Sequence, residues 1–141
     1  MIDREAIYAA LYQRLAALPG LATSSRKLLH WADVPSDDQP ALFLAQGDQS
    51  TSTTSGQETV WMLRANVYLY VHTAGEAPGP VINPLVDAVC NTVNAIHPVT
   101  GRAMLDVPGV SYCRVDGTIE TDEGTLGEQA VAIIPITILA A

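Results

Sequence analysis

Three histidines are the side chains of this sequence best suited to acid–base or metal chemistry. They are His30, His72 and His97, and none has another histidine or a cysteine two to four residues along the chain. Metal sites commonly draw two of their ligands from such a short spacing. We therefore expect no metal site, and we expect His72 and His97 to lie at the ends of a strand and of a helix.

The other candidates for catalysis form no recognisable constellation. The carboxylates at 37–38 and 122–123 are adjacent pairs, and neighbouring side chains in extended chain point apart. The segment 124–127 has neither the lysine nor the length of a phosphate-binding loop, so it is expected to be a hairpin turn. No Gly-x-Ser-x-Gly motif is present. The sequence predicts a protein that is not an enzyme and that uses no cofactor.

The two cysteines, Cys90 and Cys113, have a spacing that matches no zinc or redox motif. We expect reduced and buried thiols, with a disulfide as the alternative. The N-terminus, Met-Ile-Asp-Arg-Glu, lacks a basic leader followed by an apolar run. The longest uncharged apolar stretch, 129–141, is too short to span a bilayer. The expected location is the cytoplasm.

The charge composition narrows the possible functions. The 141 residues include 15 acids and 7 Lys or Arg, giving a net charge of -8, and charged residues make up 16% of the chain against 48% apolar residues. Disorder requires few apolar and many charged residues, and conventional DNA binding requires a basic stripe, so both are excluded. The length suits one domain over 1–141 that buries a core of its own.

Apolar residues at helical spacing predict two helices. The first covers 3–18, with Asp3 as its N-cap and a Pro-Gly pair after it. The second begins at Asn83 and Pro84, and a His-Pro pair ends it. Both are amphipathic, so each should pack one face against a sheet.

Strands are predicted at five places, most clearly at 61–72, where apolar residues occupy every second position. Pro135 in the last strand cannot donate to a ladder, which predicts an edge position or a bulge for that strand. The elements together predict an α+β fold: a single domain with a mixed, mostly antiparallel sheet of about five strands and two helices packed on one face. The other expected strands are 28–32, 41–45, 110–120 and 129–139.

The segment 46–59 is almost wholly polar and joins two predicted strands as a long hairpin with a flexible, protruding loop. Loops of this length in compact domains are usually functional or disordered. We expect it to contact a partner or a neighbouring subunit, and the alternative is a floppy insertion without a role. The candidate contact residues are Gln49, Ser50, Thr51, Ser52, Thr53, Thr54 and Ser55.

The last predicted strand is apolar on nearly both faces. In so small a protein, this pattern suggests that one face of the strand is covered by a neighbouring subunit. The candidate interface residues are Ile134, Ile136 and Ile138. The alternative is a sheet that is covered by the helices and loops of its own chain.

Four segments, taken in their order along the chain, form a pattern that resembles a known protein family. They are Arg4-Glu-Ala-Ile-Tyr-Ala-Ala-Leu-Tyr-Gln-Arg-Leu15, the alternating Val67-Tyr-Leu-Tyr-Val71, Val110-Ser-Tyr-Cys-Arg-Val-Asp-Gly-Thr-Ile-Glu120 and Gly127-Glu-Gln-Ala-Val-Ala-Ile-Ile-Pro-Ile136. Their arrangement resembles the tail-terminator, or tail-completion, proteins of long-tailed bacteriophages, and the resemblance covers nearly the whole chain. The polar insertion at 46–59 departs from the pattern.

The resemblance implies a structural virion protein of the tail or neck, assembled in the host cytoplasm. Such a protein forms a homo-oligomeric, hexameric ring that caps the tail tube, ends tube polymerisation and provides the head-attachment surface. Its partners would be its own copies, the tail-tube protein and a head-completion or connector protein, with no membrane. DNA would pass through without specific binding, which an acidic wall favours because it repels phosphates. The alternatives are another neck or tail-tube component and, in a different class, a small cytoplasmic ligand-binding module or enzyme.

Overall fold

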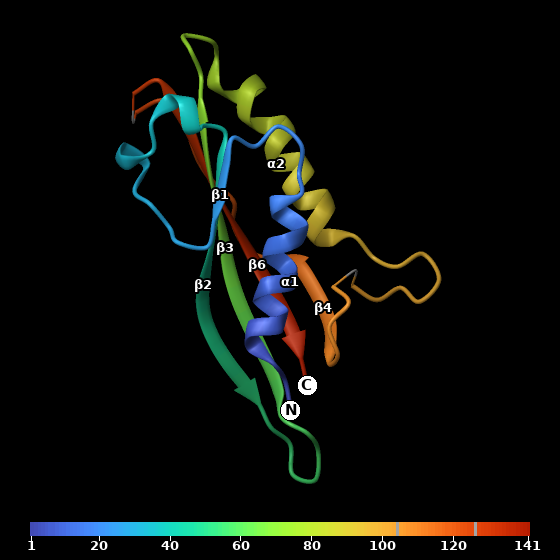
Figure 1. Cartoon of the computed structure of the whole chain (residues 1–141). Coiled ribbons are helices and arrows are strands. Elements are labelled where there is room, and N and C mark those ends of the chain that lie inside the picture. Colours follow the sequence, from blue (N-terminus) through green and yellow to red (C-terminus); the bar gives the residue numbers. More distant parts are fainter. Residues whose placement is uncertain (104, 126) are drawn as a thin grey trace.

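The computed structural model describes residues 1–103, 105–125 and 127–141, which form two α-helices and a six-stranded sheet (Figure 1). In chain order the elements are α1 (Arg4–Ala16), β1 (Thr23–Ser25), the 3-10 turns η1 (Trp31–Asp33) and η2 (Ser36–Asp38), β2 (Ala41–Ser52), β3 (Val60–His72), α2 (Pro78–Asn94), β4 (Val110–Val115), β5 (Glu120–Asp122) and β6 (Gln129–Ala140). The strand order is β1-β2-β3-β6-β4, and β5 also pairs with β6. β1 is parallel to β2, and the other pairs are antiparallel. The predicted α+β fold is confirmed, with six strands in place of about five.

β3 and β6 form the centre of the sheet. Their antiparallel pairing runs from Trp61 opposite Ala140 to His72 opposite Gln129. Every second residue of β3 from Leu63 to Val71 is buried together with residues of both helices. The alternation predicted for 61–72 is therefore confirmed, and the sheet has one face under the helices and one face without helices (Figure 1).

α1 begins where the sequence predicts. The side chain of Asp3 caps the helix by accepting a hydrogen bond of 3.0 Å from the backbone N–H of Ala6. Ile7, Leu11 and Leu15 recur at helical spacing and are almost fully buried. The helix thus lies along the sheet with this stripe in the core.

α2 begins earlier than predicted, at Pro78 instead of near Pro84, which lies inside the helix. The first four N–H groups of a helix have no partner within it, so Pro78 and Pro80 cost no hydrogen bond there. Pro84 removes one intrahelical bond and lies on the exposed side of the helix. Ile82, Val89 and Val93 bury the opposite side, and this burial holds the helix together through the proline-rich turn.

β6 is an interior strand, so the predicted edge position was wrong. The carbonyl oxygen of Pro135 accepts a hydrogen bond of 3.1 Å from Asp116 N. Since the N and O of one strand residue point to the same edge, the nitrogen of Pro135 also faces the side of β4 and β5. On that side the pairing with β4 ends at Ile136 and the pairing with β5 begins at Ile133. The missing N–H therefore falls in the gap between two partner strands.

The candidate interface residues of β6 lie in the core of the single chain. Ile134, Ile136 and Ile138 are 0%, 1% and 0% exposed and pack with β3 and both helices. Their side chains do not reach the surface, so the predicted ring interface at these positions is corrected. The strand is apolar because its own helices cover one face and because other segments cover part of the opposite face.

Two predicted strands differ in the structure. The segment 28–32 is not a strand, because His30 Nδ1 accepts from Ala32 N at 3.2 Å and starts the turn η1. The segment 110–120 is divided into β4 and β5 at Gly117, which has φ +122° and whose added Cβ would lie 3.1 Å from the Pro135 ring. Only glycine combines that backbone conformation with so close an approach.

The predicted hairpin is confirmed, but the loop that joins its strands is shorter than predicted. β2 continues to Ser52, and β3 starts at Val60, so the connection is 53–59. The register shifts between Gln46 and Gln49, which marks a bulge. Backbone pairing does not require apolar side chains, and for this reason the polar residues up to Ser52 still form a ladder.

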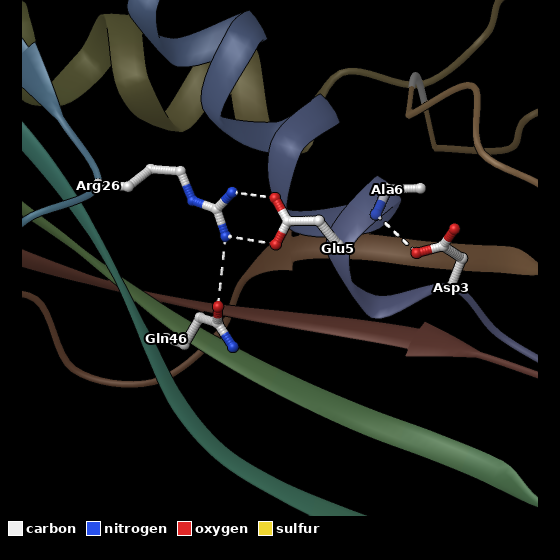
Figure 2. A network of polar contacts seen from close by, with 5 residues as sticks. All are labelled: Asp3, Glu5, Ala6, Arg26 and Gln46. Carbon is white, nitrogen blue, oxygen red and sulfur yellow. Dashed lines mark hydrogen bonds and ion pairs between the residues drawn. The ribbon is translucent and has the colours of Figure 1, made fainter.

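A polar network ties α1 to the edge of the sheet (Figure 2). Arg26, which follows β1, donates to both carboxylate oxygens of Glu5 and also donates to Gln46 Oε1 at 3.3 Å. The hydrogen bonds from the Arg26 guanidinium lower the pKa of the Glu5 carboxyl. Glu5 is exposed, so this ion pair orients the helix more than it stabilises the fold.

The buried position of Ile134 predicts a large loss of stability on truncation. Ile134→Ala should lower the free energy of unfolding by about 2–5 kcal/mol, because it deletes buried apolar groups from the core and leaves a cavity in their place. Chemical denaturation of the purified protein measures this change. Ile119→Ala is the matched control, since Ile119 is 36% exposed and should lose less than about 1 kcal/mol. Equal losses in the two variants would contradict the core placement.

Candidate assembly surfaces

The predicted contact residues lie on a hairpin arm that extends beyond the helices (Figure 1). We define the hairpin arm as residues 49–63. Gln49 to Ser52 belong to β2 and pair with Val60 to Leu63 of β3, whereas Thr53 to Ser55 lie in the connecting tip. The seven candidate residues are all exposed. The structure thus brings them together on one protruding element, and their contact with a partner stays a prediction.

The base of the arm is anchored to α1. Arg4 Nε donates to Gln49 Oε1 at 2.7 Å, and the Arg4 guanidinium carbon lies 4.1 Å from the centre of the Trp61 ring. Tyr8 OH donates to the backbone oxygen of Arg64 at 3.0 Å. These contacts join both strands of the arm to one helix. The tip, in contrast, has local hydrogen bonds within the described residues, such as that from Gln57 N to Thr54 O at 3.0 Å.

An open groove lies on the face of the sheet without helices. Its volume is about 600 Å³, and its walls are the segment 28–31 on one side and β5 on the other. Tyr68, Val131 and Ile133 form part of its floor. Apolar and aromatic side chains dominate the lining, and the polar side chains include Glu120 and Asp122 on β5. This surface can therefore bury an apolar segment and offers carboxylates beside it.

The segment that walls the groove is held above the sheet by a small second core. Tyr70 OH donates to Leu29 O at 2.8 Å, and the rings of Tyr70 and Phe43 lie 5.5 Å apart. Val34 and Val131 are buried in the same cluster. Sequence patterns did not predict this groove, because 28–32 was expected to form a strand. The available signal was the sequence Leu28-Leu-His-Trp31, in which a pair of leucines and a tryptophan precede a segment rich in turn residues.

The net negative charge is concentrated at one end of the molecule. β2 and β6 start at this end and β3 finishes there, since Ala41 pairs with Tyr70 and Gln129 pairs with His72. The described residues of the segments 31–40, 73–77 and 120–128 surround it, and these segments contain no Lys or Arg. The remaining seven acids and the seven bases lie elsewhere and cancel. The eight acids of this acidic end are Asp33, Asp37, Asp38, Glu76, Glu120, Asp122, Glu123 and Glu128.

The acidic end and the tip of the hairpin arm lie at opposite ends of the sheet (Figure 1). The tip of the arm extends past the end of the sheet at which Trp61 pairs with Ala140, and both chain termini lie near this end. One end of the molecule is thus polar with little net charge, and the other is strongly acidic. A subunit with this polarity can distinguish two different partners along its long axis.

The three histidines considered for acid–base or metal chemistry are not part of any metal-binding arrangement in the described residues. His30 and His97 each accept a backbone N–H through Nδ1, while His72 ends β3. Across 1–103, 105–125 and 127–141 no group of three His, Cys, Asp or Glu is placed to hold a metal ion. In those same ranges no helix is long and apolar enough to cross a membrane.

Both cysteines are free thiols. Cys113 is buried under the helices, and burial raises the pKa of its thiol to about 12. Cys90 is half-buried on α2, and burial also raises its pKa. A raised pKa keeps a thiol protonated and unreactive, so neither group has the properties of a nucleophile. The prediction of reduced thiols agrees with the structure, although only Cys113 is fully buried.

Comparison with known proteins shows similarity at the level of the fold. No family model matches the sequence, and no curated protein matches it. One solved structure, titled "Virion of native gene transfer agent (GTA) particle", contains a chain that superimposes with a TM-score of 0.57 at 12% sequence identity. The alignment covers 96% of this protein and 95% of that chain. The two chains share a fold. The shared fold extends over nearly the full length of both chains.

The anchoring contacts of Arg4 predict a specific effect on the hairpin arm. Arg4→Ala should lower the free energy of unfolding by about 1 kcal/mol, because it removes a cation–π contact and a hydrogen bond. Amide hydrogen exchange in the arm should accelerate up to about tenfold, with smaller effects in the core strands. Arg114→Ala is the control, because Arg114 is an exposed arginine on β4. Unchanged exchange in the arm of Arg4→Ala would contradict this anchoring.

Proposed function

We propose that this protein is a structural protein of a tailed, phage-like virion. The observation that carries the proposal is the shared fold with a chain of a gene transfer agent virion over almost the full length of both proteins. Within that class, the resemblance of its segments to tail terminators favours a ring that caps the tail tube, ends tube polymerisation and provides the surface for head attachment. Its partners are further copies of itself, the tail-tube protein and a head-completion or connector protein.

The two ends of the molecule support an orientation within such a ring. The hairpin arm is a protruding, hydrogen-bonding element, and we place its tip against the last ring of the tube. The acidic end then points away from the tube, toward the head. DNA that leaves the head meets carboxylates, which repel its phosphates and let it pass without binding. Without a basic surface patch at that end, the protein cannot hold the genome in place.

Deletion of the gene tests the proposed function. A terminator limits tube growth, so its loss should give tails of variable and excessive length without heads. Electron microscopy of negatively stained lysates measures both properties, and a plasmid copy of the gene should restore normal particles. A tube subunit gives the opposite result, because its loss abolishes tails. Particles of normal length with heads attached would contradict any role in tail completion.

Replacement of the arm tip tests the proposed contact with the tube. Ser52 and Val60 are directly opposite in the ladder, so residues 53–59 can be replaced by Asn-Gly, which forms a two-residue hairpin turn. The fold should persist, because the tip contributes nothing to the core. The plasmid-borne variant should fail to restore normal tail length in the deletion strain. A control with the seven tip residues replaced by Gly and Ser keeps the loop length. Full restoration by the Asn-Gly variant would contradict the contact.

A further inference from the structure

The exposed apolar side chains of this protein gather at two separated surfaces. Seven large hydrophobic residues are exposed in the described ranges, and four of them belong to these two places. Leu28 and Leu29 line the groove. Ile96 and Val99 lie on a turn that follows α2. An apolar groove and an apolar projection on one chain are the two halves of a heterologous contact.

The projection is the turn 96–103, and internal bonds preorganise it. Ile96 and Ala103 form a β-bridge at its base. His97 N donates to Arg102 O at 2.7 Å, and His97 Nδ1 accepts from Val99 N at 3.2 Å. Gly101 has φ +68° and donates to His97 O at 2.8 Å. The turn thus holds Val99, whose side chain is 86% exposed, in a fixed position that needs little ordering on binding.

The groove and the turn cannot meet within one chain. The groove lies on the face of the sheet without helices, whereas the turn 96–103 follows the C-terminus of α2 on the opposite face. Figure 1 shows the loop after α2 extending sideways from the helix layer. An occupant of the groove that comes from this sequence must therefore come from a second copy.

The charges of the two surfaces are complementary. Arg102 is an exposed cation on the turn 96–103, and Glu120 is an exposed acid on the β5 wall of the groove. The β5 wall of the groove belongs to the acidic end, whose segments contain no Lys or Arg, whereas the opposite wall follows the exposed Lys27. The turn places the apolar Val99 beside the cation Arg102, and the groove places an apolar floor beside the carboxylate of Glu120. The opposite charges favour the turn as the occupant of the groove over an acidic segment.

We propose that the turn 96–103 of one copy inserts into the groove of the next copy, with Val99 on the apolar floor and Arg102 beside Glu120. The contact joins two different surfaces, so it repeats from copy to copy and closes into a ring when the rotation allows. This inference rests on the proposed function, because it supplies the contact that builds the proposed ring.

Directional cross-linking tests the contact on the full chain. Val99→Cys and Leu28→Cys are made as separate variants, since Leu28 is an exposed residue of the groove wall. Each variant is oxidised alone and as a mixture, at about 1 mM protein, where even a contact with a Kd of 1 mM is populated. The proposal predicts a disulfide-linked dimer in the mixture and none in either variant alone. The unmodified chain, with Cys90 and Cys113, gives the background.

A charge exchange provides a second readout that needs no new thiol. Arg102→Glu and Glu120→Arg should each weaken self-association about tenfold in sedimentation velocity, and the double variant should recover it. Arg102→Glu combined with Asp87→Arg is the control, because Asp87 is an exposed acid on α2 outside the groove. Recovery in this control as well would overturn the pairing.

The outcomes separate this inference from the proposed function. Cross-linking of Leu28→Cys alone would show a symmetric pair of grooves, and this result overturns the inference. A mixture that associates but forms no disulfide would show a different interface, and this result also overturns it. A strict monomer at about 1 mM also overturns it. The role in the tail is judged by the gene deletion, whose result does not depend on which surfaces the copies use.

Discussion

The long antiparallel pairing of β3 with β6 is the constraint on which the rest of the structure depends. It places two strands with buried alternate residues at the centre of the sheet, from Trp61–Ala140 to His72–Gln129. Both helices cover one face of this pair, and the isoleucines of β6 are buried there. The same pairing fixes where the chain must turn. The hairpin arm continues past one end of the pair, and the acidic connections gather at the other.

Much of this fold could be predicted from local patterns. The period-two alternation at 61–72 and the N-cap at Asp3 each depend on one segment and its neighbours, and both are present in the structure. Two errors have physical causes. An apolar strand such as 129–139 has the same composition whether helices of its own chain or a second subunit cover it. A proline in a strand indicates a missing N–H, but it does not show whether that N–H would face solvent or a break between two partner strands.

The candidate surfaces were harder to predict, because they are made by distant segments. The groove needs 28–31, β3, β5 and β6 together, and no single stretch of sequence carries its signature. The acidic end is likewise dispersed over three segments that only the sheet topology brings together. The hairpin arm was predictable because one continuous polar segment, 46–59, joins two predicted strands. The length of the connecting loop was overestimated, since side-chain polarity says little about whether backbone pairing continues.

The subunit has different surfaces along and across its long axis. The arm lies at one end and the carboxylates lie at the other, and the groove and the turn are on opposite faces. Such a subunit suits a single closed ring between two unlike structures. Electron cryo-microscopy of the purified particle tests this most directly. The account predicts one ring of this chain at the head-side end of the tail tube, with the arm tips on the tube and the acidic end toward the head. Copies repeated along the tube, or a ring in the reverse orientation, would contradict it.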